Sequence, residues 1–348
     1  MENSPFVSII IPNYNGRRFL RDCLSSISAI DYPTDRYEVI LVDNGSTDDS
    51  ASYVTEEFPW VKTIRLSANH GYPGACNVGA EKAAGDLFVF LNNDTIVDKS
   101  WLRELVKVAL TSDKVVVCGS KVLLMEDGMP QYAGGFISLI GGGIFYPLRE
   151  TGKNHYFVGT IYGASFLIKR DVFKMLGGFE DYYFVYSDEI DLCYRTWMCG
   201  YSVAYCPSSI VYHYGGGTAR RSYTKHKNVL FQMLRSPLYA YHGNRNSLVN
   251  ILKNFEPRYV LIGLTLFSIY ISAQLLSSLI DKNKTNMLAI LKAIKWVLVN
   301  FRFIMRRRSL VQAKRVVKDR VLIESGVITS PKRMLAIRRF GKKFHARL

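Results

Sequence analysis

The first hundred residues alternate short apolar runs with segments of helical spacing. The apolar runs cover residues 6–11, 37–42, 61–66 and 87–91. Between them, apolar residues recur at helical spacing, as they do in residues 19–27. Buried strands of a parallel sheet read as continuous apolar runs, and each needs a crossover connection before the next. The pattern therefore predicts an α/β fold whose sheet is covered by helices on both faces.

Polar residues follow three of these runs at the point where each run ends. They form the sequences PNYN at 12–15, DNGS at 43–46 and NNDT at 92–95. Ligands of open α/β sheets bind beyond the carboxyl ends of the strands. We therefore expect these three segments to share one edge of the sheet and to form a binding site.

Two aspartates at strand ends are candidate ligand residues. Asp94 stands where a divalent cation bound to a diphosphate would need a carboxylate, although Asp94 and Thr95 could instead cap the helix that contains Trp101. Asp43 can accept hydrogen bonds from a base or a ribose, or it can close an Asx turn before the next helix. The residues alone leave both alternatives open.

The segment at 67–80, SANHGYPGACNVGA, resembles a phosphate-binding loop that opens a helix. It contains Gly71, Gly74 and Gly79 but matches neither GxGxxG nor a Walker loop. Backbone amides at a helix N-terminus can hold a diphosphate. A tight turn with close helix–strand packing would explain the glycines equally well.

Three carboxylates lie together in YSDEIDLCYRTW at 186–197. They are Asp188, Glu189 and Asp191, and an amphipathic pattern follows at once. Adjacent carboxylates repel, which raises the pKa of one of them and suits it to act as a general base. Acids in a first helical turn also stabilise the helix, and Asp191 has the spacing for an ion pair with Arg195.

His213 ends a further apolar run in IVYHYGGGT. An imidazole at a strand end beside carboxylates can complete a metal site, while a single histidine is more often structural. The six cysteines are scattered without a CxxC pair, so the sequence predicts neither a zinc site nor a disulfide framework.

Composition limits the possible partners. The chain has 348 residues, of which 48% are hydrophobic, and this fraction excludes an intrinsically disordered chain. Residues 301–348 carry +13 of the formal net charge of +16, so the preceding part is nearly neutral. The basic residues do not interleave with stacking aromatics, which argues against nucleic acid and favours an anionic membrane surface. The first residues lack the pattern of a secretory signal, which favours a cytoplasm-facing protein.

Two apolar segments precede the basic residues. Residues 259–280 contain no charge, and residues 287–305 read as an amphipathic helix with Lys292, Lys295 and Arg302. A single membrane span would place the basic tail outside, against the positive-inside rule. We therefore expect a hairpin or an interfacial pair of helices in the cytoplasmic leaflet, with a soluble dimerisation helix as the alternative.

Taken in order, seven sequences resemble family 2 inverting glycosyltransferases of the GT-A fold. They are VSIIIPNYNG, VILVDNGSTD, NHGYPGACNVG, LFVFLNNDT, GASFLIKRDVFKMLGGFED, YSDEIDLCYR and VYH. The rhamnosyltransferase-like branch matches best, over about residues 5–250. The resemblance implies a Rossmann-like mixed sheet flanked by helices.

The resemblance also implies a binding site for a nucleoside-diphosphate sugar. PNYN and Asp43 would hold the base and ribose, and the strand at 162–166 would shape the sugar pocket. The implied donor-binding residues are Pro12, Asn13, Tyr14, Asn15, Asp43, Asn69, Gly74, Asn77, Asn93, Asp94, Gly163 and Ala164.

Two departures from the family pattern concern the metal and the base. The resemblance implies Mg²⁺ or Mn²⁺ on Asp94 and His213, but many relatives read Asp-x-Asp where this chain has Asn92, which is therefore a supporting residue. Relatives often read Glu-Asp at the acid pair, with the second residue as base. Here position favours Glu189 and residue type favours Asp188.

We expect Asp191 and Arg195 to support the site. The expected domains are a GT-A domain at 1–250, membrane-associated helices at 251–305 and a basic tail at 306–348. The implied reaction moves a sugar, with rhamnose as the branch-level expectation, to a hydroxyl of a glycan or polyprenyl-linked glycan. We expect it at the cytoplasmic face of the cell membrane, in cell-surface polysaccharide synthesis, with a homo-oligomer left open. The alternatives are a nucleotidyltransferase acting on sugar phosphates and a non-catalytic basic membrane-binding protein with a degenerate transferase domain.

Overall fold

A mixed ten-stranded sheet forms the centre of the computed structural model, which describes residues 4–132, 134–145, 152–215 and 236–329. Four parallel strands make up its N-terminal half, in the order β4-β1-β2-β3. Their bounds are β1 (Val7–Asn13), β2 (Tyr37–Asp43), β3 (Lys62–Arg65) and β4 (Leu87–Leu91). These are the four predicted apolar strands, and their parallel pairing is confirmed.

The other half of the sheet is built around β11 (Ser165–Lys169), which is antiparallel to both β4 and β6 (Val115–Leu124). Next to β6 lies the parallel strand β12 (Ser202–His213). Shorter strands extend this half, namely β5 (Thr95–Val97), β7 (Pro130–Tyr132) and β10 (Tyr156–Phe157). A second, three-stranded sheet contains β8 (Gly135–Ser138), β9 (Gly143–Phe145) and β13 (Ile328–Thr329).

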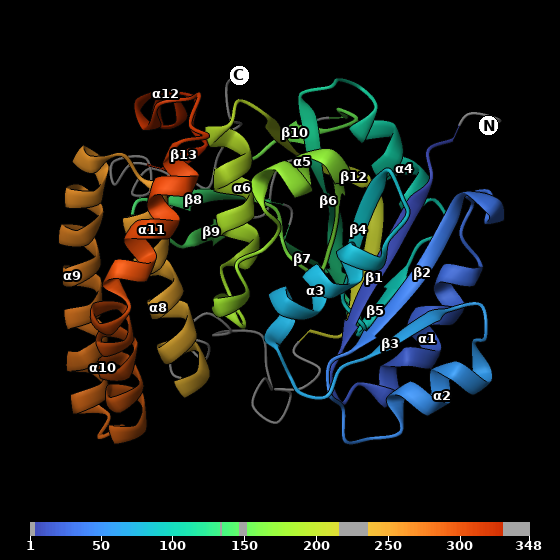
Figure 1. Cartoon of the computed structure of the whole chain (residues 1–348), viewed down its shortest axis with the longest axis horizontal. Helices are drawn as coiled ribbons and strands as arrows, with labels where there is room; N and C mark the ends of the chain where they lie inside the picture. The colour runs from blue at the N-terminus through green and yellow to red at the C-terminus, as the bar shows by residue number, and fades with distance from the viewer. Residues whose placement is uncertain (1–3, 133, 146–151, 216–235, 330–348) are drawn as a thin grey trace.

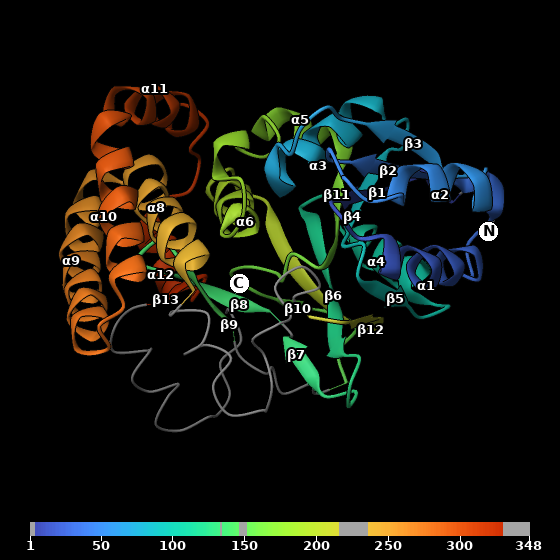
Figure 2. The same ribbon diagram turned by 90° about the horizontal axis from the view of Figure 1, so that it is seen from below.

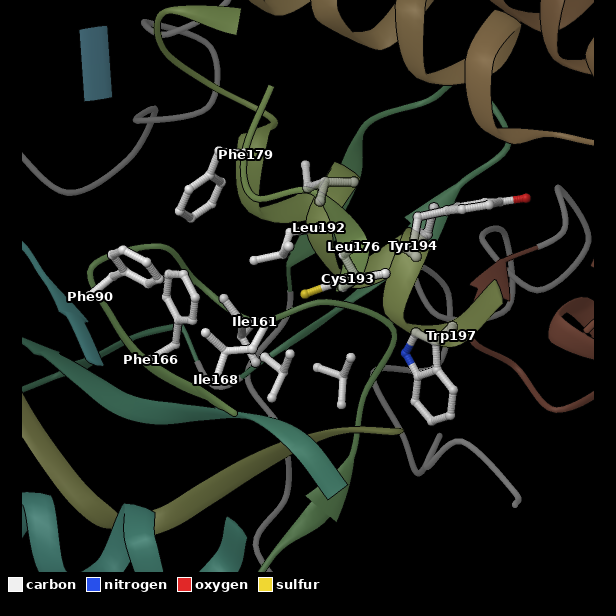
Figure 3. Packing of buried hydrophobic residues seen from close by; sticks show 14 of the residues in the cluster. Phe90, Ile161, Phe166, Ile168, Leu176, Phe179, Leu192, Cys193, Tyr194 and Trp197 are labelled. Atoms are coloured by element: carbon white, nitrogen blue, oxygen red, sulfur yellow. The ribbon is translucent and has the colours of Figure 1, made fainter. Parts of the chain in front are cut away.

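Helices cover both faces of the main sheet. One face packs on α1 (Arg17–Ser28), α2 (Ser50–Glu57) and α4 (Trp101–Ala109), and the other packs on α3 (Gly71–Lys82), α5 (Arg170–Leu176) and α6 (Asp188–Met198). In β1 the side chains alternate, so that Ile10 belongs to the second core while Ile9 and Ile11 belong to the first. Figure 3 shows the second core, where Phe90 and Phe166 of the sheet face Phe179 and residues of α6. Two single 3₁₀ turns, η1 (Thr34–Arg36) and η2 (Asp181–Tyr183), complete this part.

The C-terminal part forms a helical layer beside α6 (Figures 1 and 2). It contains α8 (Pro237–Asn254), α9 (Pro257–Ile280), α10 (Lys284–Val299), α11 (Phe301–Gln312) and the short α12 (Asp319–Glu324). The predicted helix at 287–305 is two helices, because the chain breaks at Asn300, whose side-chain amide donates to the carbonyl of Trp296. The boundary expected after residue 250 falls inside α8.

The expected basic tail is folded as far as the structure describes it, which is to Thr329. Arg307 forms an ion pair with the buried Glu180 at 2.9 Å, and Arg308 donates to the carbonyl of Leu252 at 2.6 Å. Strand β13 then pairs with β8 of the sheet domain. Residues 306–329 therefore differ from a free tail, because several of their cations bind acids and carbonyls of the same chain. Residues 330–348 lie outside the described residues.

Candidate active site

The carboxyl ends of β1, β2 and β4 meet at one rim, as predicted. The buried Asn13 connects them, since its Nδ2 lies 3.2 Å from Oδ1 of Asp43 and its Oδ1 accepts from Asn93 Nδ2 at 2.6 Å. The residues after β1 bind those after β2, because Oδ1 of Asn15 accepts from the amide of Thr47 at 2.8 Å. Pro12 and Asn13 therefore belong to the frame of the rim.

Tyr14 is the aromatic residue of the PNYN segment, and its exposed ring could contact a ligand. It is 39% exposed, at the edge of the rim. Asn15 beside it has a left-handed backbone, with φ of 51°. This conformation turns the chain sharply between β1 and α1, which leaves Tyr14 outside the core.

The structure does not support the alternative in which Asp94 caps the helix that contains Trp101. Helix α4 begins at Trp101, and the side chain of Asp98 accepts from the amide of Ser100 at 2.9 Å. Similarly, the side chain of Asp48 accepts from the amide of Ser50, the first residue of α2, at 3.1 Å. Asp43 and Asp94 thus lie at the rim without capping the next helix.

The predicted metal pair is brought together across 119 sequence positions. Oδ1 of Asp94 lies 3.1 Å from Nε2 of His213, and both side chains are buried. Nδ1 of His213 lies 2.9 Å from Oε1 of Gln131. With Nδ1–H donating to that oxygen, Nε2 would be left with a lone pair beside the carboxylate of Asp94, so both atoms could ligate one cation.

The pair therefore fits a divalent cation that takes its remaining ligands from a substrate phosphate and from water. Among the described residues, no group of three or more His, Cys, Asp or Glu side chains could hold a metal ion by itself. The neighbouring Asn92 belongs to the support of this site, since its backbone amide donates to the carbonyl of Ala164 at 2.9 Å.

The Gly-rich segment opens α3, as predicted. Helix α3 begins at Gly71, whose φ is +75° and whose amide donates to Oδ1 of Asn69 at 2.8 Å. A Cβ at Gly71 would lie 2.3 Å from the carbonyl oxygen of Phe184, so only glycine fits there. Gly74 lies in the first turn, where a Cβ would meet His70 at 2.8 Å. Asn69 and Gly74 thus shape the N-terminus of α3 next to the rim.

Asn77 does not join the other implied donor residues. Its Nδ2 donates to the carbonyl of Phe179 at 2.9 Å and to the carboxylate of Asp181, and its Oδ1 accepts from the amide of Phe179 at 3.0 Å. It lines a pocket of about 640 Å³ together with residues of α5 and α11. The side chain therefore holds the segment around η2, and its expected contact with the donor stays a prediction.

The acid pair begins α6 and faces the strand that was expected to shape the sugar pocket. An ideal Cβ on Gly163 would lie 3.7 Å from Cδ of Glu189, and the carbonyl of Gly163 accepts from the hydroxyl of Tyr72 at 3.2 Å. Asp188 is buried, whereas Glu189 is half-buried. Burial raises the pKa of Asp188 to about 7, and burial with the charge of Asp188 raises the pKa of Glu189 to about 8.

Asp191 and Arg195 form the expected pair, and the pair is buried. Oδ2 of Asp191 accepts from Nε of Arg195 at 2.8 Å and lies 2.8 Å from its Nη2. Nη1 and Nη2 of Arg195 donate to the backbone carbonyls of residues 176 and 178. Burial opposes ionisation of Asp191, but Arg195 and Lys253 outweigh it and lower its pKa to about 2. These residues support α6 and do not line the rim.

Functional reasoning from the sequence missed the polar residues of α8. Asn246, Asn250, Lys253 and Asn254 are all buried, and they bind the segment before α6 or α6 itself. The one signal in the sequence is the number of asparagines in a helix, since asparagine is a poor helix former.

Comparison with known proteins gives a family match. Residues 8–177 match the family described as Glycosyl transferase family 2. The O-antigen biosynthesis protein RfbC of Myxococcus xanthus is 32% identical over 234 residues, which cover 63% of this chain and 18% of that protein. The probable glycosyltransferase YdaM of Bacillus subtilis is 26% identical over 227 residues, which cover 61% and 51%. The chain thus spans about half or less of the length of these relatives.

Two solved structures share the fold. GalNAc-T7, solved with UDP, GalNAc and Mn²⁺, has a TM-score of 0.56 at 20% identity, over 72% of this chain and 51% of that one. The mannosyltransferase PcManGT from Pyrobaculum calidifontis, solved with GDP-Man and Mn²⁺, has a TM-score of 0.54 at 18% identity, over 89% and 86%. Residues 8–177 are therefore similar to glycosyltransferase family 2, and the chain shares the GT-A fold of these two transferases.

Proposed function

We propose that the chain is a metal-dependent inverting glycosyltransferase. It would move a hexose from a nucleoside-diphosphate sugar to a hydroxyl of a glycan or a polyprenyl-linked glycan, in cell-surface polysaccharide synthesis. The observation that carries the proposal is a continuous series of contacts around the rim. It runs from Asp43 through Asn13 and Asn93 to the neighbouring Asp94 and on to His213.

The donor would lie across this rim. Tyr14 and Asp43 would meet the base and the ribose. The amides of His70, Gly71 and Tyr72 at the start of α3 donate to Asn44, Asn69 and Phe184 of the chain itself, so the diphosphate would be held mainly through the metal. Asp94 and His213 would hold Mg²⁺ or Mn²⁺, which when bound neutralises charge on the departing diphosphate. The two similar solved structures contain Mn²⁺ together with UDP or GDP-Man, which supports a divalent metal and a nucleotide as the ligands of this rim.

The acid pair would supply the base. The acceptor oxygen attacks C1 of the sugar while its proton passes to a carboxylate, and the bond between C1 and the phosphate oxygen breaks. Attack opposite to the leaving group inverts the anomeric configuration. Glu189 is the better candidate, because it is half-buried and approaches the backbone of Gly163, whereas Asp188 is buried. A carboxyl whose pKa is raised toward neutrality suits this role.

The acceptor and the location are inferred from the C-terminal helices. Among the described residues, α9 is the one helix long and apolar enough to cross a membrane, with a mean hydropathy of 1.8. Only 17% of its apolar window is buried. We place this face on the anionic cytoplasmic surface of the cell membrane, as a peripheral or monotopic contact, with a lipid-linked glycan as acceptor and no nucleic-acid partner. A homo-oligomer is compatible with this arrangement.

A donor panel tests the proposal. Thermal shifts with dTDP-rhamnose, UDP-hexoses and GDP-mannose, with and without Mn²⁺, are expected to show stabilisation by one donor in the presence of metal. dTDP-rhamnose is the first candidate. Transfer assays with that donor should release a nucleoside diphosphate. Consumption of added pyrophosphate, with release of a nucleoside triphosphate and a sugar 1-phosphate, would instead indicate a nucleotidyltransferase. The absence of both stabilisation and transfer would contradict the proposal.

A further inference from the structure

The segment that leads into the acid pair has an unusual backbone. Phe184, Tyr186 and Ser187 all have left-handed conformations, with φ of 62°, 68° and 63°. Such conformations are unfavourable for residues other than glycine and persist only where the surroundings hold them. Asp188 and Glu189 follow directly. Whatever holds this segment therefore sets the direction in which both carboxyls point.

One side chain of α8 holds most of the segment. The Nδ2 atom of Asn246 lies 3.0 Å, 2.9 Å and 2.7 Å from the carbonyl oxygens of Tyr183, Val185 and Tyr186. Asn246 is 0% exposed. Its Oδ1 accepts from Nε of Arg245 at 2.9 Å, which fixes the orientation of the amide with its donor side toward the segment.

Other residues of α8 act at both ends of the same segment. Arg245 donates to the carbonyls of Tyr182 and Tyr183 at 2.6 Å and 2.8 Å. The fully buried Lys253 lies 2.8 Å from Glu180 and 2.7 Å from Asp191 of α6. Because α8 begins at Pro237, all these contacts come from outside the matched residues 8–177.

The backbone carbonyls of residues 183–186 need other donors, because a segment with a left-handed backbone does not form the regular hydrogen bonds of a helix or a strand. Three of them share the single amide of Asn246. Without it, the carbonyl of Tyr183 would keep Arg245 and the amide of Val185 as donors. The carbonyls of Val185 and Tyr186 would lose the donor that Asn246 supplies, and the segment would move toward solvent. Movement of the segment would carry Asp188 and Glu189 with it.

We infer that Asn246 is a positioning residue for the acid pair, acting through the backbone of residues 183–186. The inference rests on the proposed function, because it assumes that one of the two carboxyls is the base. It adds that the C-terminal helices are part of the catalytic unit. Asn246 touches neither of the substrates in this scheme.

Asn246→Ala and Asn244→Ala form a matched pair of variants. Both asparagines are buried on α8, but Asn244 donates to Gln274 and to the carbonyl of Ala240. For Asn246→Ala we expect kcat to fall by about 100-fold, because small displacements of reacting groups cost this much, while the donor Kd measured with Mn²⁺ stays within about threefold. Asn244→Ala should lower the Tm but leave kcat within about threefold. Equal kcat values for the two variants would overturn the inference.

A double-mutant cycle separates positioning from general destabilisation. In a Glu189→Gln background, or in Asp188→Asn if that residue proves to be the base, Asn246→Ala should reduce the residual rate by less than about threefold. A full 100-fold further loss would mean that Asn246 does not act through the acid pair. If Asn246→Ala does not fold, Asn246→Ser keeps one donor, and an intermediate kcat with normal donor affinity is expected.

The two hypotheses fail in different ways. If both Asp188→Asn and Glu189→Gln keep wild-type kcat, the base assignment is wrong and the role of Asn246 fails with it. If either variant loses turnover while Asn246→Ala and Asn246→Ser keep theirs, only the positioning role is wrong.

Discussion

Nε2 of His213 lies 3.1 Å from Oδ1 of Asp94, so that the end of β12 meets the residues that follow β4. Neither residue belongs to a cluster large enough to hold a metal by protein ligands alone among the described residues. Such a two-residue site binds its ion together with a substrate that supplies phosphate oxygens. Metal affinity should therefore depend on the nucleotide.

Replacing Asp94 tests this site. We expect Asp94→Ala to lower Mn²⁺-dependent transfer by at least about 100-fold, because the charge of the leaving diphosphate loses its compensation. Calorimetry should show that Mn²⁺ no longer strengthens nucleotide binding. Asp98→Ala is the control. Asp98 accepts from the amide and the hydroxyl of Ser100 in the turn before α4, so its loss should cost about 1 kcal/mol of stability without changing metal dependence. Normal transfer by Asp94→Ala would refute the assignment.

The base is identified by two isosteric variants. We expect Glu189→Gln to lower kcat by about 100-fold or more while donor affinity is retained, because the amide cannot accept the acceptor proton. Asp188→Asn should have the smaller effect on kcat, since the Asp188 side chain is buried. The opposite order of the two effects would assign the base to Asp188.

Stability should depend on pH through the same carboxyls. Their pKa values are raised by burial, so the fold favours the protonated forms and loses stability as pH rises toward 8. Glu189→Gln removes one of these ionisations. Its free energy of unfolding relative to wild type should therefore increase between about pH 5 and pH 8 in urea titrations. A difference that is constant with pH would contradict the raised pKa.

Asp191 should show the opposite dependence. Its pKa is lowered to about 2, so its charge stabilises the fold above the unfolded pKa near 4 and this contribution is lost as pH falls. Asp191→Asn should be strongly destabilised at pH 7, and the difference from wild type should shrink toward pH 2. Acid unfolding followed by circular dichroism measures this, and a difference that grows toward low pH would contradict it.

Asn77 should be structural. Asn77→Ala removes three hydrogen bonds to Phe179 and Asp181 and should cost about 1–3 kcal/mol of stability. The donor Kd should not change beyond about threefold. Thermal unfolding and calorimetry on the same preparation test both statements, and a large loss of donor affinity in a protein of normal stability would restore the donor role.

The apolar face of α9 should bind membranes. Ile269 and Leu276 are 65% and 58% exposed and lie two helical turns apart. Replacing both by glutamate should weaken binding to anionic vesicles by at least tenfold, because each apolar side chain contributes about 1.5–3 kcal/mol when buried. Leu110→Glu, at an exposed leucine beyond α4, should bind normally. Undiminished vesicle flotation of the double variant would contradict the membrane contact.

Much of the candidate site at the rim could be predicted from local patterns in the sequence. The apolar runs indicated the parallel strands, and residues just after parallel strands meet at one edge because the strands run in the same direction. Asn13, Asp43 and Asp94 could therefore be placed together before their contacts were known. The partner of Asp94 was indicated as well, since His213 also ends a strand of this sheet.

The sequence by itself determined which chemistry the rim offers, because strand periodicity and side-chain type are local properties. Only the tertiary structure decided how the acid pair is held and what the C-terminal residues do. Asn246 meets the left-handed segment about 60 positions earlier in the chain, and Arg307 meets Glu180 across an even longer separation. Such contacts depend on how whole helices pack, and no short pattern of residues encodes that packing.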